Sequence, residues 1–503
     1  FKNYRHYSNV NRKWTKRGLP GPEPELLFGN LRDIWNYDEP RSLVLRDWSK
    51  KYGKIYGFYE GQRPFIVVSD FETINEIVVK KTDHFNARAR FALQERNDGP
   101  NTRIIEARGP HWKRLRTLGS MAFTNKSLRN VLSTVEHSAT TMIEGMAKQQ
   151  GEINTLLFFQ EYTLDVICKV ALGMRDVEMF NNKYFDSCTG IFYRPLRHPI
   201  TIFPSFFPFA VDEIRSVLML LHRNPVAYYY FLCLAKLFSS YKPPFVVLMD
   251  MLKANVEQRK KERAENKQST GDFIDLFLDA EVDQSEVQFG EYSDTAKKLS
   301  SDEIVGQCFI FLLAGFDTTS NSLAYTTHFL ANHHDVQKKL VEEVDEFLLE
   351  NETLEIERLG DLKYMDAVIK ESLRHYPLGS VVVTRECSKP CEIGGFKFEV
   401  GDMVATDTWT MHMDENVWGE DAKEFRPERW LEDSDRPRAA FQSFGEGPRI
   451  CLGMRLAYME EKIALVKLLS RFRIEKTAQT NPIKLVGSFT VSPHKVMVKL
   501  VPR

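Results

Sequence analysis

Cysteine is scarce in this sequence, which has only seven, thinly spread over 503 residues. An odd and scattered set of cysteines argues against a disulfide framework and favours a reducing compartment. An excess of charge of either sign is also lacking, because 68 basic residues nearly balance 69 acidic ones and leave a net charge of −1. General nucleic-acid binding requires a strongly basic domain, so we do not expect nucleic acid as a partner.

Long hydrophobic runs are missing as well. No stretch reaches the roughly 18 apolar residues that can cross a bilayer, so the printed sequence holds no transmembrane helix. A third absence is local: residues 1–22 contain six basic side chains and no acidic one. A basic segment followed by a Pro-rich stretch is typical of the cytoplasmic end of a membrane anchor. We therefore expect residues 1–24 to be a juxtamembrane segment and hinge, with a solvated basic tail as the alternative.

The periodicity of the remaining chain is mainly helical. The pattern predicts a helix over residues 41–51 and a hairpin whose strands are residues 54–59 and 64–69. Helical patterns then continue to about residue 375, and short strands return at residues 381–385, 392–400, 403–408 and after residue 471. Length alone would allow about three domains. The pattern instead favours one mainly α unit with small β-sheets, of the α+β class, over residues 25–503.

The longest helix is expected from Ser300 to about Asn332. Ser300 and Glu303 have the spacing of a capping box at its start. Within it, Thr318 can hydrogen-bond the carbonyl four residues earlier and Asp317 can supply protons. A buried Thr-rich turn with its aspartate at solvent is the alternative.

A Gly- and Pro-rich loop, residues 444–453, ends at Cys451. An amphipathic helix follows, so backbone N–H donors and the positive end of its dipole should lower the pKa of the thiol. Arg449 adds positive charge two residues away. A thiolate held in this way can act as a nucleophile or bind a metal, whereas most lone cysteines are merely buried small side chains.

The spacing around this cysteine resembles in full the signature of the cytochrome P-450 family, the haem-thiolate monooxygenases: Phe444, Gly447, Arg449, Cys451 and Gly453. The resemblance implies the cytochrome P-450 fold and a bound haem b whose iron takes Cys451 as its axial ligand. It also implies that Arg449 pairs with a haem propionate and that Phe444 packs near the thiolate.

Two more segments resemble motifs of the same family. Residues 314–319 resemble its oxygen-activating motif, which implies a catalytic acid–alcohol pair, Asp317 and Thr318, and a small residue beside the haem, Ala314. The pair Glu371 and Arg374 precedes Cys451 at the family's spacing. Together with Arg429 it is implied to form a buried charge network, in which Trp430 stands where the family usually has Phe. An ordinary surface ion pair is the alternative.

Weaker assignments complete the site that the resemblance implies. Trp112 and Arg116, one helical turn apart, and Arg385, on a later strand, are expected at the haem propionates. The family's layout implies a substrate pocket lined by Phe309, Phe316, Val381, Val382 and Phe489.

The function implied is insertion of one oxygen atom of O₂ into a lipophilic substrate such as a xenobiotic, a steroid or a fatty acid. The sequence resembles eukaryotic microsomal members, nematode ones included. That implies electrons from NADPH through NADPH–cytochrome P-450 reductase, with cytochrome b5 as a second donor, at the cytoplasmic face of the endoplasmic reticulum membrane. Two alternatives stay open: an isomerase or dehydratase acting on peroxides without a reductase, and a non-catalytic haem-binding or ligand-binding protein.

Three surface features carry weaker expectations. The aromatic stretch from Phe203 to Phe209 is expected either in the core or in a lid that dips into a membrane interface. Cys387 and Cys391 lack the further ligands that a metal site needs. Basic residues near the proximal motifs are expected to form a docking face for an acidic reductase: Lys113, Arg114, Arg436 and Arg438.

Overall fold

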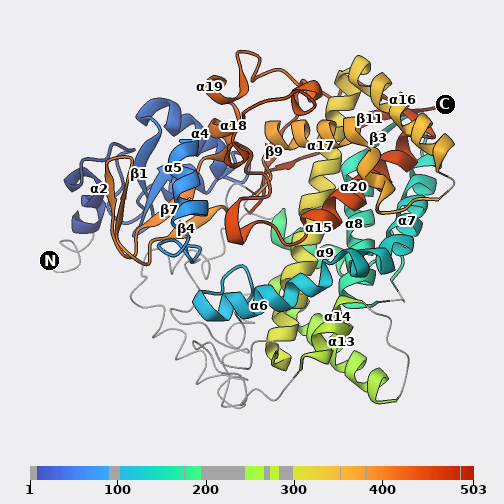
Figure 1. The fold of residues 1–503 in the computed structure, drawn as a ribbon, viewed down its shortest axis with the longest axis horizontal. Helices are drawn as coiled ribbons and strands as arrows, with labels where there is room; N and C mark the ends of the chain where they lie inside the picture. The colour runs from blue at the N-terminus through green and yellow to red at the C-terminus, as the bar shows by residue number, and fades with distance from the viewer. Residues whose placement is uncertain are drawn as a thin grey trace, which may run out of the picture.

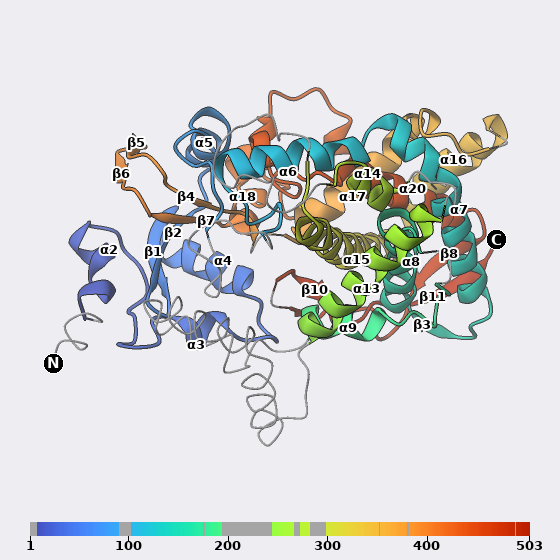
Figure 2. The ribbon, with the colours of Figure 1, turned by 90° about the horizontal axis from the view of Figure 1, so that it is seen from below.

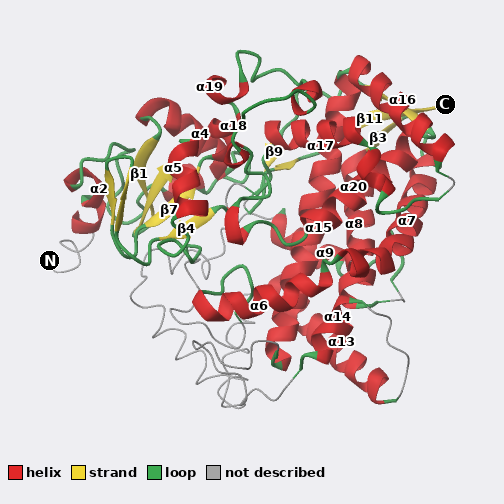
Figure 3. Cartoon of the chain, viewed as in Figure 1, coloured by secondary structure: helices red, strands yellow, loops and turns green. Residues whose placement is uncertain are grey.

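The chain folds with most strands on the side that holds the N-terminus and most helices on the other (Figure 1). The computed structural model describes residues 8–89, 102–174, 177–193, 244–265, 272–281, 298–351, 353–379, 382–487 and 489–503. The aromatic stretch from Phe203 to Phe209 and the expected pocket residue Val381 lie outside these residues. Figure 3 shows that helices make up most of the described chain, which confirms the mainly α class with small sheets.

The helices account for most of the described chain. The α-helices are α2 (Lys13–Lys16), α3 (Leu31–Ile34), α4 (Arg41–Tyr52), α5 (Phe71–Asn75), α6 (Gly109–Ala122), α7 (Asn125–Ala147), α8 (Thr155–Leu172), α9 (Phe185–Phe192), α13 (Pro244–Ala264), α14 (Phe273–Asp279), α15 (Ser301–Asn332), α16 (His334–Glu350), α17 (Lys363–His375), α18 (Thr408–His412), α19 (Glu415–Trp418) and α20 (Met454–Leu469). A π-turn, η1 (Glu76–Lys80), continues α5, and 3₁₀ turns are η4 (Arg358–Asp361), η6 (Pro427–Trp430), η7 (Arg438–Ala440) and η8 (Gly447–Arg449). Within the described ranges, none of these helices is both long and apolar enough to cross a bilayer.

The central element is α15, whose 32 residues span about 48 Å at 1.5 Å per residue. Its predicted start is confirmed: the Ser300 side chain accepts from the Glu303 backbone N–H, and the Glu303 side chain accepts from the Ser300 N–H. The helix packs along α8 and also contacts α13, α17 and α20. Because it is covered on most sides, nearly all of its side chains are buried.

The strands form four small sheets: β1 (Ile55–Glu60), β2 (Arg63–Val68), β7 (Met403–Thr406) and β4 (Thr384–Glu386) in one; β3 (Glu152–Asn154), β11 (Met497–Pro502) and β8 (Phe472–Lys476) in another; β5 (Cys391–Ile393) with β6 (Phe396–Phe398); and β9 (Leu485–Val486) with β10 (Ser492–Pro493). The predicted β1–β2 hairpin is confirmed as an antiparallel pair, with Phe58 opposite Phe65. Strand β7 joins β2 in parallel, which places the C-terminal third of the chain against its beginning.

Two predicted strands are shorter than the pattern suggested. Residues 392–400 form the β5–β6 hairpin and not one strand, because Gly394 and Gly395 turn the chain with positive φ. The strand predicted over residues 403–408 ends at Thr406, since the Asp407 side chain caps the next helix by accepting from the Thr410 N–H. Local polar caps thus outweigh β propensity here.

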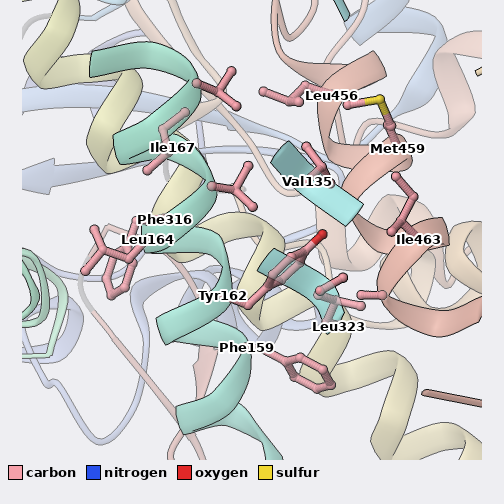
Figure 4. Packing of buried hydrophobic residues seen from close by; sticks show 14 of the residues in the cluster. Val135, Phe159, Tyr162, Leu164, Ile167, Phe316, Leu323, Leu456, Met459 and Ile463 are labelled. Carbon is pink, nitrogen blue, oxygen red and sulfur yellow. The ribbon is translucent and has the colours of Figure 1, made fainter. Parts of the chain in front are cut away.

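A large hydrophobic cluster joins α7, α8, α15 and α20 (Figure 4). Phe316 and Leu323 of α15, Tyr162 and Ile167 of α8, and Met459 of α20 all belong to it. This cluster fixes α15 against α20, the helix that follows Cys451, and so fixes the two elements that carry the chemistry.

The basic segment at the N-terminus is partly docked on the first sheet. Trp14 is buried, and its indole N–H donates to the Phe58 carbonyl. Lys13 and Arg17 both pair at 2.8 Å with the buried carboxylate of Asp402. Two of the six basic residues therefore neutralise one internal acid.

Candidate active site

The loop before α20 has a backbone that glycine alone adopts easily. Gly445 and Gly447 both have φ of 72°, in the left-handed region. A Cβ on Gly447 would lie 2.0 Å from the Val78 carbonyl oxygen in the π-turn η1, so no larger residue fits. The Cys451 N–H donates to the Phe444 carbonyl at 2.8 Å, while the Phe444 ring packs on Tyr458 of α20. The loop is therefore held on both sides, and the position of the thiol is fixed.

Cys451 differs from the other described cysteines because it alone is exposed. Protein atoms nevertheless surround the thiol, and this burial raises its pKa above the usual 9.0. The backbone N–H groups of Gly453 and Met454, with Arg116 and Arg88, act in the opposite direction but do not outweigh it. The expectation of a lowered pKa was therefore wrong for the chain by itself, since desolvation is the larger effect. A bound metal removes this penalty, because a coordinating thiol is deprotonated outright.

One face of α15 stays open in an otherwise buried helix. Ala314 is exposed, and Ile310 and Thr318 are half-buried. These residues are four apart, so they share a single face. The methyl group of Ala314 leaves room for a flat ligand there. Sequence reasoning missed Ile310, although its spacing of four from Ala314 was available as a signal.

The residues close to Ala314 lie on two faces of α15: one that is open to a ligand and one that packs against α8. Thr318 donates its hydroxyl to the Ala314 carbonyl at 2.7 Å, as predicted. Gly315 faces α8, where an added Cβ would lie 2.8 Å from Ile167 Cδ1. Its small size therefore serves helix packing, and only Ala314 leaves space for a ligand.

Asp317 is fully buried, which excludes the alternative of an aspartate at solvent. Its Oδ2 accepts from Thr490 Oγ1 at 2.5 Å and from Asn321 Nδ2 at 2.9 Å. Burial raises the pKa of the carboxyl to about 6, although these donors act to lower it. Thr490 and Asn321 were not predicted, since no local motif marks them.

Two arginines that were expected at the haem propionates, Arg449 and Arg116, hydrogen-bond to backbone carbonyls of the protein. Arg449 donates to the carbonyls of Asn86 at 2.9 Å and Ala107 at 2.6 Å, and its guanidinium stacks 4.5 Å from the ring of Trp112. Arg116 donates to the Ile450 carbonyl at 2.8 Å, next to Cys451. These contacts hold the cysteine loop against α6 and keep both cations near the thiol.

Arg385, which is buried, and Arg88, which is half-buried, are neighbouring cations. Burial lowers the pKa of Arg88 to about 10 and that of Arg385 to about 9, and each guanidinium would be stabilised by an anion. The nearby carboxylate of Glu386 is already paired with Arg108 at 2.6 Å. Arg88 Nε has no hydrogen-bond partner among the described residues. Arg88 was missed by sequence reasoning, because nothing local separates it from an ordinary surface arginine.

The predicted charge network is confirmed. Glu371 accepts from Arg374 at 2.8 and 2.9 Å and from Arg429 at 2.9 Å, and all three side chains are buried. The arginines hold the pKa of Glu371 well below its usual range against the effect of burial. Trp430 also donates its indole N–H to Glu371 at 2.9 Å, a bond that phenylalanine cannot make. The network joins α17 to η6 and excludes a surface ion pair.

The expected substrate-pocket residues do not share one face. Phe316 is fully buried against Phe185 and Phe192 of α9, on the side of α15 away from Ala314. Phe309 is buried against Phe245 and Arg103, so neither phenylalanine lies on the open face. Val382 and Phe489 are half-buried, and the Val382 carbonyl accepts from Arg88.

The proposed docking face needs one correction. Arg114 is buried and paired with Glu303 at the start of α15, so it cannot meet a partner protein. Lys113 and Arg438 are exposed. Arg436 is half-buried and stacks 4.5 Å from the Trp418 ring.

A solvent-accessible cysteine, an open helix face at Ala314, and two neighbouring arginines, Arg88 and Arg385, that pair with no carboxylate of the described residues all suit the same ligand. Haem is flat, carries two propionates and binds thiolate at its iron, so fold and site together define a haem-thiolate protein. The cytochrome P-450 family model matches residues 19–500, and the chain belongs to the cytochrome P-450 family. The resemblance seen in the sequence is thus confirmed, and with it the haem cofactor and the monooxygenase class.

Relatives from Caenorhabditis elegans match nearly the whole chain. Identity is 40% over 512 residues with cytochrome P-450 CYP13A5 and 40% over 518 residues with CYP13A3. It is 39% over 508 residues with CYP13A1. Each alignment covers 97% of this chain and 95% of the relative. The predicted kinship with nematode members is therefore confirmed.

Proposed function

We propose that this haem-thiolate monooxygenase oxidises lipophilic small molecules with electrons from NADPH, delivered by a cytochrome P-450 reductase and, as a second donor, cytochrome b5. A substrate RH reacts with O₂, NADPH and one proton to give ROH, H₂O and NADP⁺. The observation that carries the proposal is the solvent-accessible residue Cys451, on a loop that two left-handed glycines fix near Arg88. Neither Arg88 nor its neighbour Arg385 forms an ion pair with a carboxylate of the described residues.

The proposed roles of the residues follow from their positions. Cys451 binds the iron, and Arg88, Arg116 and Arg385 neutralise the propionates. The haem, once bound, supplies oxygen binding and O–O cleavage, which thiolate ligation favours. Thr318 offers a hydroxyl on the open face of α15, and Asp317, buried on another face of that helix with a pKa raised to about 6, can take up and give a proton.

Reduction of the holoenzyme with dithionite under CO tests the ligand. Wild-type protein should give the red-shifted Soret band of thiolate ligation, and Cys451→Ala should abolish it. Cys391→Ala, a half-buried cysteine elsewhere, is the matched control and should leave the band unchanged. A wild-type band typical of histidine ligation would contradict the assignment.

Turnover distinguishes the alternatives. NADPH-dependent O₂ consumption with a substrate panel is expected here, whereas a peroxide isomerase or dehydratase would work without NADPH. Absence of any O₂ consumption would favour a ligand-binding protein. The same panel is screened first for substrate-induced Soret shifts, and the compound that gives the largest shift is used as the substrate in the turnover assays.

We further propose that the protein works at the cytoplasmic face of the endoplasmic reticulum membrane. Support comes from the basic residues before residue 22, of which Arg12 and Lys16 are exposed. Flotation with phosphatidylcholine vesicles containing phosphatidylserine should recover the chain, and neutralising Arg12 and Lys16 should weaken recovery. Equal recovery of both proteins would count against this role of the segment.

A further inference from the structure

Asp317 is part of a buried cluster that joins three elements. Thr490 stands just before β10, Ser492 begins β10, Asn321 lies one turn further along α15, and Tyr193 follows α9 directly. Asn321 Nδ2 donates to both Asp317 Oδ2 and Ser492 Oγ at 2.9 Å, while Tyr193 donates its hydroxyl to Asn321 Oδ1 at 3.2 Å. The cluster therefore links the carboxyl to the C-terminal hairpin and to α9.

No charge compensates Asp317 in the described part of the chain, where it forms no ion pair with lysine or arginine. The titratable groups that feel its charge are neutral at pH 7: Tyr37, Cys188, Tyr193 and Tyr325. Tyr193 and the two donors to Oδ2 lower the pKa of the carboxyl, and burial raises it by more. Oδ1 is buried and makes no hydrogen bond of good geometry with any described residue. That oxygen can carry a proton and pass it on, with the Tyr193 hydroxyl as a neighbour of the carboxyl.

The two members of the acid–alcohol pair face different ways. Thr318 lies on the half-open face with Ala314, whereas Asp317 is fully buried and bonded to Thr490. Figure 2 shows β10 and α9 below α15 and α6, which carries Arg116, above it. The carboxyl is thus held on the side of α15 away from α6.

We propose that Thr490 and Asn321 are positioning residues that fix the Asp317 carboxyl, and that protons reach it through the hydroxyls of Tyr193, Ser492 and Thr490. This inference rests on the proposed role of Asp317 in proton supply. Because the two side chains face different ways, water carries the proton from Asp317 Oδ1 to the Thr318 side of α15, and a proton from solvent replaces it along the hydroxyls. The cluster keeps its own protons over a turnover, because each O–H that gives a proton receives one.

Infrared titration of the ferric holoenzyme tests the positioning role. The carboxylic C=O band absent in Asp317→Asn reports the protonated side chain. Thr490 donates to the ionised carboxyl and so lowers its pKa; Thr490→Val removes that donor without changing shape. The midpoint of the band should therefore rise by about one pH unit in Thr490→Val. Thr490→Ser should return it to the wild-type value.

Thr480→Val is the matched control, because Thr480 is also a buried threonine near the C-terminal sheets but donates to the Met497 carbonyl. It should leave the midpoint unchanged. An unchanged midpoint in Thr490→Val, or an equal shift in Thr480→Val, would overturn the inference.

Peroxide release adds a functional readout. With reductase, NADPH and the substrate of largest Soret shift, Thr490→Val and Tyr193→Phe should release severalfold more H₂O₂ per NADPH, at an unchanged substrate KM. Thr490→Ser and Thr480→Val should match wild type. Unchanged release in Thr490→Val and Tyr193→Phe would overturn the proton route. Unchanged release in Asp317→Asn would instead remove Asp317 from the proposed function, while the infrared midpoint would still decide the positioning role.

Discussion

At the scale of single residues, the site is defined by groups whose environment does not match their charge. Arg385 is buried beside Arg88, and burial lowers its pKa to about 9. A buried cation without a counterion is costly, since desolvation is not offset by attraction. Such a pair is stabilised strongly by a dianionic ligand.

We expect Arg385→Met to speed haem loss while sparing the haem-free chain. A charge-assisted hydrogen bond contributes about 1.5–3 kcal/mol, so haem should dissociate at least about tenfold faster. The haem-free variant should unfold at the same urea concentration as the haem-free wild type or at a higher one, because the substitution removes the Arg385 charge, which is desolvated in the fold. Haem transfer to apomyoglobin measures the rate, with Arg473→Met on the exposed face of β8 as control. A rate equal to that of the control would contradict a propionate contact.

The residues that sequence predicted and those it missed differ in one respect. Cys451 and Thr318 lie in short motifs whose spacing survives folding, so both could be assigned in advance. Arg88, Thr490 and Ile310 reach the site through packing of distant segments, and no local pattern marks them. The family's layout predicted Phe316 in the substrate pocket, but its ring packs on α9 and does not lie on the open face of α15.

At the scale of elements, one carboxylate joins a helix to a distant turn. The Glu371 side chain of α17 accepts hydrogen bonds from the side chains of Arg374, Arg429 and Trp430. It also accepts from the backbone N–H of Arg426. Local periodicity predicted α4, α15 and the β1–β2 hairpin well, because hydrophobic pattern and caps are local. It failed at β5–β6, where two glycines turn the chain, and it could not give the pairing of β2 with β7.

Glu371→Gln should destabilise the protein by about 3–5 kcal/mol, because it leaves buried arginines without a charge partner. The pKa of Glu371 is depressed in the fold, so its contribution is present above the unfolded pKa near 4.5 and is lost as pH falls below it. The difference in urea midpoint between wild type and variant should therefore stay constant from pH 7 to about pH 5 and shrink as the pH falls below 4.5.

Glu357→Gln breaks an exposed pair with Arg129 and is the control, for which no change in midpoint is expected. Trp430→Phe should cost about 1 kcal/mol, the value of one hydrogen bond. A loss in Glu371→Gln no larger than in Glu357→Gln would mean that the network adds nothing to stability.

At the scale of the whole molecule, the N-terminal segment is tied to the first sheet and not left as a loose tail. Trp14 packs against Gly57, where a Cβ would lie 2.3 Å from the indole ring. Asp402, between β6 and β7, pairs with Lys13 and Arg17. Sequence could show that the segment is basic, but the acid that neutralises it lies about 385 residues away.

Trp14→Ala should therefore release the segment while the helical side stays folded. Loss of a large buried aromatic costs about 3–5 kcal/mol, most of it local to this docking site. Brief trypsin treatment should cut the variant after Lys13, Lys16 or Arg17 at a much higher rate than wild type, with the CO-bound Soret band retained. Asn9→Ala, an exposed change in the same segment, should be cut as slowly as wild type. Equal cleavage rates for Trp14→Ala and wild type would show that the indole does not hold the segment, and that Asp402 with its two cations, Lys13 and Arg17, holds it instead.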